Sequence, residues 1–268
     1  PQQLVLLSPM IGVTSLARFA GVLGWPAWFP AFDRAAWIDI YPEYNPYKYN
    51  SFPINGARQS SLLTRQLQGQ MQAAVESGKI AGLPPLLVFQ SLADATVSTQ
   101  AVVAELFARL PANGSELVLV DIDRSLLVDS LLRSEALQAP AQLLPPAPRG
   151  WTARVLSNLG EASGELIEET TPAGARQSAR RSLGLRYPFG VYSLSHIALP
   201  FPVTDGLYGL DPDPGDVPGL ALGALSVRGE RGLLWVSQED LARIKCNPFF
   251  AHLLQQIDRR LQATEVVP

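Results

Sequence analysis

Three short apolar runs constrain the fold of this chain more than any other feature of its sequence. Residues 4–8 (LVLLS), 85–91 (PLLVFQS) and 116–122 (ELVLVDI) are apolar at nearly every position, rather than at every second one. A strand with this pattern is buried on both faces, which is typical of a parallel sheet covered by helices. The spacing of apolar residues also predicts helices, over 58–77, 99–110 and 125–137. The alternation of the two patterns predicts an α/β fold with helices on both faces of the sheet.

The pattern changes after the Pro-rich stretch 140–148. Residues 152–158 (TARVLSN) and 164–170 (GELIEET) predict two shorter, paired strands. Residues 193–201 (SLSHIALPF) form an apolar run that one histidine, His196, interrupts. The tail is expected to be helical, over 238–245 and 248–261.

The composition argues against several classes of function. The net charge is −3 and no basic stripe is present, so we expect no nucleic-acid partner. No apolar run reaches the roughly 18 residues that a membrane span needs. Two histidines and one cysteine cannot form a usual Cys/His zinc site by themselves, and we expect no metal and no cofactor. Cys246 is interpreted as a structural thiol, and a cytoplasmic and a periplasmic location are both compatible with the sequence.

Acidic residues follow two of the predicted strands. In an open parallel sheet, functional groups collect just past the carboxyl ends of the strands. Asp94 lies there, three residues after the run 85–91. It is either a carboxylate that orients a histidine or an acid that favours the start of the helix expected near residue 99. Asp121 and Asp123, at the end of the third run, rank below Asp94 as turn or cap residues.

The two histidines have different surroundings. An imidazole in the apolar segment around His196 needs a hydrogen-bond partner. It is either a general base held by a carboxylate or a core histidine bonded to the backbone. His252 has helical spacing with Phe249 and Gln256, and we interpret it as a helix-surface or boundary residue. The acidic loop 211–216 has its glycine one place too early for an EF-hand, so we interpret it as a turn rather than a calcium site.

Residues 25–52 are unusually aromatic: they hold ten of the 22 aromatic residues of the chain. One interpretation is a cap over a pocket, in which aromatic rings form an apolar wall for a substrate. The other is that these rings only pack the segment onto the rest of the protein. The candidate substrate-binding residues are Trp25, Trp28, Phe29 and Trp37.

Five segments, taken in their order, resemble the α/β-hydrolase superfamily. They are LVLLSPMIGVT (4–14), PLLVFQSLADATV (85–97), GSELVLVDIDRS (114–125), YSLSHIALPF (192–201) and LYG (207–209). The resemblance is closer to a bacterial group of serine hydrolases described as lysophospholipase- or esterase-like. It implies that the chain is part of a hydrolase that cleaves an ester-type bond in a small apolar acyl substrate. It also implies that Asp94 is the acid and His196 the base of a Ser-His-Asp triad.

The same resemblance implies an organisation of the chain. Residues 1–12 and 81–125 would be core strands and helices in the carboxyl-terminal part of the hydrolase sheet. Residues 13–80 would be an aromatic lid inserted after the first strand. Residues 126–190 would be an additional β/α insertion, and residues 191–268 the histidine loop and C-terminal helices.

The chain departs from this family in lacking the nucleophile motif G-x-S-x-G. Ser8 follows a strand but precedes Pro9, and Ser195 adjoins His196, yet neither has the context of a nucleophile turn. The resemblance therefore implies that the serine and the oxyanion-hole amides come from a segment before Pro1 or from a companion chain. The alternative is a non-catalytic, hydrolase-like module for binding or assembly.

The first strand leads to the same expectation of a partner. A parallel sheet that starts at residue 4 leaves one apolar strand edge unpaired, and such edges associate. We therefore expect this chain alone to be poorly soluble or to pair with an N-terminal polypeptide.

Overall fold

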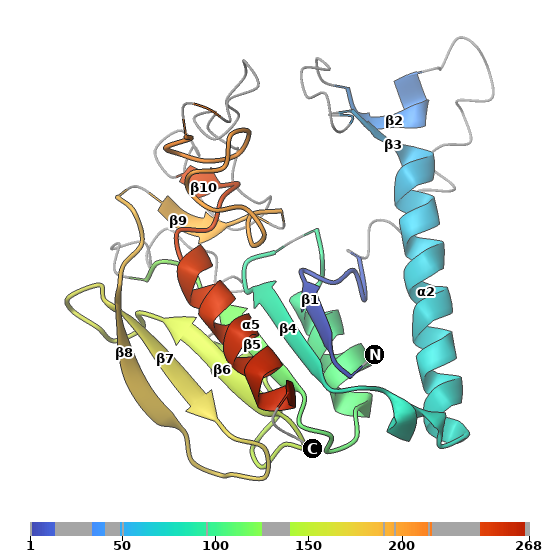
Figure 1. The fold of residues 1–268 in the computed structure, drawn as a ribbon. Helices are drawn as coiled ribbons and strands as arrows, with labels where there is room; N and C mark the ends of the chain where they lie inside the picture. Colours follow the sequence, from blue (N-terminus) through green and yellow to red (C-terminus); the bar gives the residue numbers. More distant parts are fainter. Residues whose placement is uncertain are drawn as a thin grey trace.

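A six-stranded sheet forms the centre of the protein (Figure 1). The computed structural model describes residues 2–13, 34–40, 49, 51–94, 96–124, 140–189, 191–195, 197–213, 215 and 242–265. In spatial order the strands are β1 (Leu4–Leu7), β4 (Leu86–Ser91), β5 (Glu116–Val120), β6 (Thr152–Ser157), β7 (Leu166–Thr171) and β8 (Ala179–Leu185). The first four are parallel to their neighbours, whereas β7 and β8 are antiparallel additions. The sheet is therefore mixed but mostly parallel, as in an α/β fold.

The three apolar runs form strands as predicted. β4 is buried at every position and β5 at four of its five positions. β1 is the exception: it lies at the edge of the sheet and is half-buried along its length. Its sequence is that of an interior strand, although only one neighbour is present among the described residues.

The two shorter paired strands are also confirmed, as β6 and β7. They do not form a separate sheet: β6 pairs with β5, and β8, which the sequence did not predict, extends the sheet beyond β7. The described part of the stretch 126–190, which we expected to be an insertion, thus adds three strands to the central sheet.

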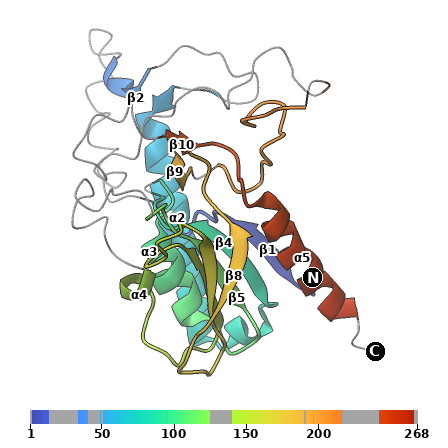
Figure 2. The same cartoon turned by 90° about the vertical axis from the view of Figure 1, so that its left-hand side faces the viewer.

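Helices cover both faces of this sheet, as expected (Figure 2). α5 (Phe250–Glu265) lies on one face, and α3 (Thr99–Ala101) and α4 (Pro140–Leu143) lie on the other. The Ser98 hydroxyl caps α3 by accepting a hydrogen bond from the Ala101 amide at 3.1 Å. The chain then continues through a π-helical turn and a 3₁₀ turn to Arg109, which matches the helix predicted over 99–110.

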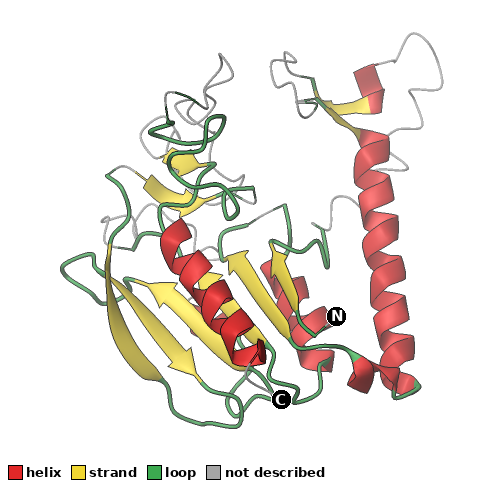
Figure 3. Ribbon diagram, in the orientation of Figure 1, coloured by secondary structure: helices red, strands yellow, loops and turns green. Residues whose placement is uncertain are grey.

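The long helix α2 (Ile54–Glu76) confirms the helix predicted over 58–77 and stands beside the sheet (Figure 3). Leu67 and Met71 on one of its faces pack against the core, and a 3₁₀ turn over Lys79–Gly82 follows it. A short antiparallel pair, β2 (Trp37–Asp39) and β3 (Phe52–Pro53), precedes α2. No helix in the described part of the chain has the length and hydropathy of a membrane span.

The prediction for the tail was right in one place and wrong in another. α5 confirms the second tail helix. The prediction over 238–245 is wrong for β10 (Ala242–Ile244), which pairs in parallel with β9 (Val191–Leu194). Pairing with a strand that is distant in sequence overrides local helical spacing here. The remaining predicted helix, 125–137, lies outside the described residues.

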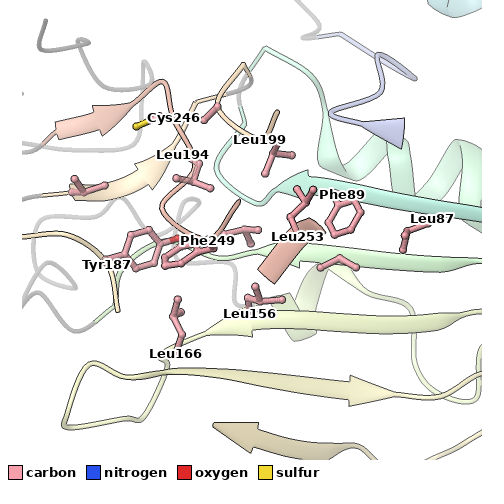
Figure 4. Packing of buried hydrophobic residues seen from close by; sticks show 14 residues of the cluster. Leu87, Phe89, Leu156, Leu166, Tyr187, Leu194, Leu199, Cys246, Phe249 and Leu253 are labelled. Carbon is pink, nitrogen blue, oxygen red and sulfur yellow. The ribbon is translucent and has the colours of Figure 1, made fainter. Parts of the chain in front are cut away.

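The larger apolar cluster joins the sheet to the segments above its strand ends (Figure 4). Phe89 and Leu156 of the sheet pack in it with Leu253 of α5, and Leu194 and Leu199 belong to the same cluster. Since Leu194 and Leu199 lie on either side of position 196, the chain around that position is anchored in the main core. A second cluster on the opposite face includes Leu86, Leu117, Phe107 and Trp151.

A buried group of charged and polar side chains also holds α5 on the sheet. Glu168 of β7 accepts from Arg154 at 3.1 Å, Arg181 at 3.2 Å and Gln256 at 2.7 Å, and lies 3.2 Å from His252 Nε2. Burial alone would raise the pKa of Glu168. The hydrogen bond with His252 and the charges of Arg154 and Arg181 outweigh burial and lower that pKa to about 2. His252 is therefore a buried residue that attaches α5 to the sheet.

Candidate functional site

The carboxyl ends of the parallel strands bring polar side chains together, as the sequence predicted. Asp94 follows β4, Asp121 and Asp123 follow β5, and Ser157 and Asn158 end β6. All five residues are buried. This edge of the sheet, called the polar edge below, is the candidate functional site.

Asp94 is held in a tight turn beyond β4. Its Oδ1 accepts hydrogen bonds from the Thr96 and Val97 amides, both at 2.9 Å, and the Gln90 amide group lies 3.5 Å from its Oδ2. The side chain is only 6% exposed. Asp94 lies four positions before Ser98, the residue that caps α3, so it stands just outside the start of the helix. Both interpretations of Asp94 stay predictions. The turn fixes the Oδ1 atom of the carboxylate in position.

A cavity of about 620 Å³ opens beside Asp94, between α2 and the start of α3. The wall of this cavity is more polar than a binding site for the expected apolar substrate would need to be. The polar lining includes Ser61, Thr64, Arg65 and Gln68 of α2, with Thr99 and Gln100 on the opposite side. Such a cavity has the size of a small-molecule site.

His196 lies outside the described residues, but the residues that precede it do not. The Ser91 hydroxyl donates to the Leu194 carbonyl oxygen at 3.0 Å, and the Asp123 amide donates to the Tyr192 carbonyl oxygen at 2.7 Å. These two bonds hold β9 across the carboxyl ends of β4 and β5. Figure 1 shows β9 above these strand ends.

The predicted aromatic wall is largely outside the structure. Trp25, Trp28 and Phe29 lie outside the described residues. Trp37 belongs to β2 and is 41% exposed. It is not among the described residues that line the cavity beside Asp94.

Asp121 and Asp123 are structural in the described geometry. Arg124 forms a two-point ion pair with Asp121, at 2.7 and 2.9 Å, and Ser157 donates to the same carboxylate at 2.7 Å. Asn158 donates to Asp123 at 2.6 Å. These bonds join the ends of β5 and β6. The sequence shows the opposite charges of Asp121 and Arg124, three positions apart. It does not show that Ser157 and Asn158 are partners of Asp121 and Asp123.

Tyr187 completes this group by donating to the Asp121 backbone oxygen. Burial, and next the negative charges of Asp121 and Asp123, raise the pKa of Tyr187 well above its ordinary value. The Tyr187 hydroxyl is therefore a permanent donor rather than an acid.

Ser8 has the backbone strain, but not the surroundings, of a nucleophile turn. It is the non-glycine residue with positive φ, 46°, in the described part, and its buried hydroxyl has no hydrogen-bond partner there. The next residue, Pro9, has no amide hydrogen to donate to an oxyanion. Beyond Pro9 the chain pairs with the segment that follows β4, where Val13 bridges to Val97.

The LYG segment, 207–209, has a structural role. The Asp205 carboxylate accepts from the Leu207 and Tyr208 amides, at 3.0 and 2.7 Å, which forms a turn. The Gly209 amide donates a hydrogen bond to the Asp205 carbonyl oxygen at 2.8 Å. A β-carbon on Gly209 would lie 2.4 Å from two carbonyl oxygens, those of Val203 and Asp205.

A Gly209→Ala substitution is therefore expected to lower the free energy of unfolding by about 1–3 kcal/mol, because the backbone must move to admit a methyl group. Thermal unfolding of the purified variant measures this. The matched control is Gly69→Ala on α2, where an added β-carbon meets no atom within 4 Å. That change is expected to stabilise the helix by up to about 1 kcal/mol. Equal stabilities of the two variants would contradict the steric argument.

Two further sequence interpretations concern residues outside the polar edge. In the described part of the loop 211–216, the Asp211 and Asp213 amides donate to the Val203 and Thr204 carbonyl oxygens. No group of three His, Cys, Asp or Glu side chains suited to a metal occurs among the described residues. Cys246 is fully buried, and burial raises the pKa of its thiol.

Comparisons with protein-family models, with curated proteins and with solved structures found no match for this chain.

Proposed function

We propose that this chain is part of a serine hydrolase of the α/β-hydrolase superfamily, which cleaves an ester-type bond in an acyl substrate. In this proposal Asp94 orients His196, and a serine outside the chain is the nucleophile. The observation that carries the proposal is the hydrogen bond from Ser91 to the Leu194 carbonyl oxygen at 3.0 Å. It brings the strand that leads to His196 to the same strand end that supports Asp94.

The setting of Asp94 supports its role as the acid. A triad carboxylate must stay ionised, must not rotate and must be shielded from bulk water. The two amides at 2.9 Å fix the side-chain rotamer, and the surrounding turn buries the carboxylate. The adjoining cavity of about 620 Å³ offers space for a substrate.

The proposed reaction has two halves. His196 takes the proton of the serine hydroxyl as the serine oxygen attacks the acyl carbon, and then gives that proton to the departing alcohol. Water attacks the resulting acyl-enzyme in the same way, which releases a carboxylic acid and restores the serine. Asp94 remains ionised and stabilises the imidazolium of His196 in both halves.

The contrast between the two edges of the sheet supports a companion polypeptide. β8 has the features that protect an exposed edge: Arg180 and Arg181 on the strand and a glycine with positive φ, Gly184. β1 reads LVLL, with no charge and no bulge. Its side chains pack on both faces of the sheet, Leu4 and Leu6 on one face and Val5 and Leu7 on the other.

The backbone of β1 has hydrogen-bonding groups on the side away from β4, where a second strand could pair. The Leu4 and Ser8 amides donate to the β4 side, at 3.1 and 2.9 Å. In a parallel ladder alternate residues bond to the same neighbour, so the amide and carbonyl groups of Val5 and Leu7 point to the outer edge. No strand of the described residues pairs with that edge. We propose that a strand of the nucleophile-bearing polypeptide occupies it.

The finer organisation is part of the same proposal. Residues 13–80 act as a lid, and their aromatic residues, including Trp25, Trp28, Phe29 and Trp37, contact the apolar acyl group. The polar wall of the cavity then faces the alcohol side of the ester. A non-catalytic module remains the alternative, since no G-x-S-x-G occurs in the chain.

Fluorophosphonate labelling tests the proposal. The protein is purified natively with the polypeptides that accompany it, and the labelled serine is located by mass spectrometry. We expect label on a co-purifying polypeptide, or on a longer one that contains this chain, at a serine other than Ser8 and Ser195. His196→Ala is expected to abolish labelling, because the serine loses its base.

Ser195→Ala is the matched control, because the Ser195 hydroxyl is buried without a hydrogen-bond partner among the described residues. This variant is expected to label normally. Absence of label from the wild-type preparation would favour the non-catalytic module, and label on Ser195 would contradict the proposed source of the nucleophile.

A further inference from the structure

A second cavity, of about 510 Å³, lies on the sheet, and none of the described residues that line it also lines the cavity beside Asp94. Its floor is formed by alternate residues of β6 and β7, which belong to one face of the sheet. The Pro-rich segment after α4 forms a wall, and α4 lies on the α3 side of the sheet in Figure 2.

Most of this cavity is apolar. Leu144, Pro145 and Pro146 line it from the wall, and Val155, Leu159 and Ile167 line it from the side of the sheet. From Ala153 to Ser157 the floor follows β6 for four residue steps, about 13 Å. The cavity is thus long enough for an extended chain of apolar groups.

One cation in this cavity has no ion-pair partner among the described residues. Of the two lining arginines, Arg180 is paired with Glu169 at 2.9 Å. Arg149 has neither an ion pair nor a side-chain hydrogen bond within the described part, and its Nε and Nη1 atoms are buried without an acceptor. Its guanidinium lies 5.5 Å from the ring centre of Trp151.

Arg149 is half-buried, and burying its Nε and Nη1 atoms without an acceptor is costly, because these atoms have lost water and gained no partner in the described part. The cost shows in the pKa of Arg149, which burial lowers. An unexplained unsatisfied group of this kind points to a missing ligand. The planar donors of a guanidinium match the two oxygens of a carboxylate.

We propose that this cavity binds a monocarboxylate with an apolar chain, of the fatty-acid class, with its carboxylate at Arg149 and its chain along β6 toward Leu159. The site shares Ser157 with the polar edge but contains neither Asp94 nor the cavity beside it, and the proposal does not depend on the hydrolase activity. The stacked Trp151 ring gives the site an optical reporter.

The experiment is a titration of the purified protein with dodecanoate and with 2-bromododecanoate, whose bromine lies next to the carboxylate and quenches nearby tryptophan fluorescence. We expect saturable binding of dodecanoate, and quenching that a Trp151→Phe variant reduces. Arg149→Met keeps the length of the side chain but removes the charge. It is expected to weaken dodecanoate binding by roughly tenfold or more, because a charge-assisted pair is lost.

Two controls separate the role of the charge from general effects. Arg176→Met removes an exposed arginine that does not line the cavity, and it is expected to leave binding unchanged. Dodecanol has the same apolar chain without a charge, and it is expected to bind wild type no better than it binds the Arg149→Met variant. The unfolding temperature of Arg149→Met is expected to equal or exceed that of wild type, because the variant lacks an unpaired buried cation.

Three results would overturn the proposal. They are absence of dodecanoate binding to wild type up to its solubility limit, equal affinities of wild type and Arg149→Met, and equal binding of dodecanol and dodecanoate to wild type. A large loss of stability in Arg149→Met would also overturn it, since the guanidinium would then be a structural group.

Discussion

An Asp94→Asn variant of the native assembly is expected to hydrolyse esters about 10³–10⁴-fold more slowly than wild type, with its fold intact. Asparagine has nearly the same shape as aspartate. Its side-chain oxygen can still accept from the Thr96 and Val97 amides, so the turn is retained. What is lost is the negative charge that holds the imidazole in the required orientation and stabilises the imidazolium. Initial rates with a chromogenic ester measure the effect.

Two further variants make this result specific. Asp94→Ala removes the acceptor as well as the charge, and we expect it to lose the same activity and in addition about 1–2 kcal/mol of stability. Asp213→Asn changes an exposed carboxylate and is expected to leave activity unchanged. If Asp94→Asn keeps wild-type activity, Asp94 is not the triad acid and only its role in the turn remains.

A Glu168→Gln variant is expected to lose about 3–5 kcal/mol of stability at neutral pH. Glu168 is 3% exposed and is the common acceptor for Arg154, Arg181 and Gln256. Removing one member of a buried ion pair leaves the other charges uncompensated, which is the costly change. Since His252 and Gln256 belong to α5, we expect this helix to loosen first. Urea unfolding measures the loss, and hydrogen exchange along α5 locates it.

The same carboxylate predicts how stability depends on pH. The pKa of Glu168 is lowered in the folded protein from its ordinary 4.5 to about 2. Its contribution is therefore fully present above about pH 4.5 and is lost as the pH falls toward 2, and it amounts to about 3 kcal/mol. Wild type is expected to show this loss in acid, whereas Glu168→Gln lacks this component.

Glu169→Gln is the matched control on the neighbouring residue of β7. The Glu169 side chain is 35% exposed and pairs with an Arg180 side chain that is 64% exposed. Surface pairs of this kind contribute about 0–1 kcal/mol, so this variant is expected to remain close to wild type in stability. Equal losses in the two variants would show that burial of the network has no special effect.

Much of the architecture could be predicted from local patterns. A run such as LLVFQS is apolar on both faces, and a strand buries both faces only where the sheet is covered on both sides. The positions of β4 and β5 could therefore be predicted from residue type alone. The position of Asp94 at a strand end followed from the same pattern. Its role in catalysis, like that of His196, remains a prediction.

The partners of the buried polar groups could not be predicted, because they are distant in sequence. Glu168 meets His252 across 84 positions, and Arg260 reaches Glu116 across 144. Periodicity describes only what a residue does within its own helix or strand. For this reason the helical spacing of His252 predicts a helix-surface or boundary residue, whereas the structure buries its side chain. Helical spacing also gives no indication of the buried cluster around Glu168.

Sequence and tertiary structure thus decided different things about this protein. By itself the sequence determined most of the described strands and helices, including β4, β5 and α2, and which of their faces are apolar, because backbone geometry and burial act on neighbouring residues. Only the tertiary structure decided that β6, β7 and β8 continue the central sheet and that Ala242–Ile244 pairs with β9. These outcomes depend on which surfaces meet, since each strand accepts any neighbour that satisfies its hydrogen bonds and covers its apolar side chains.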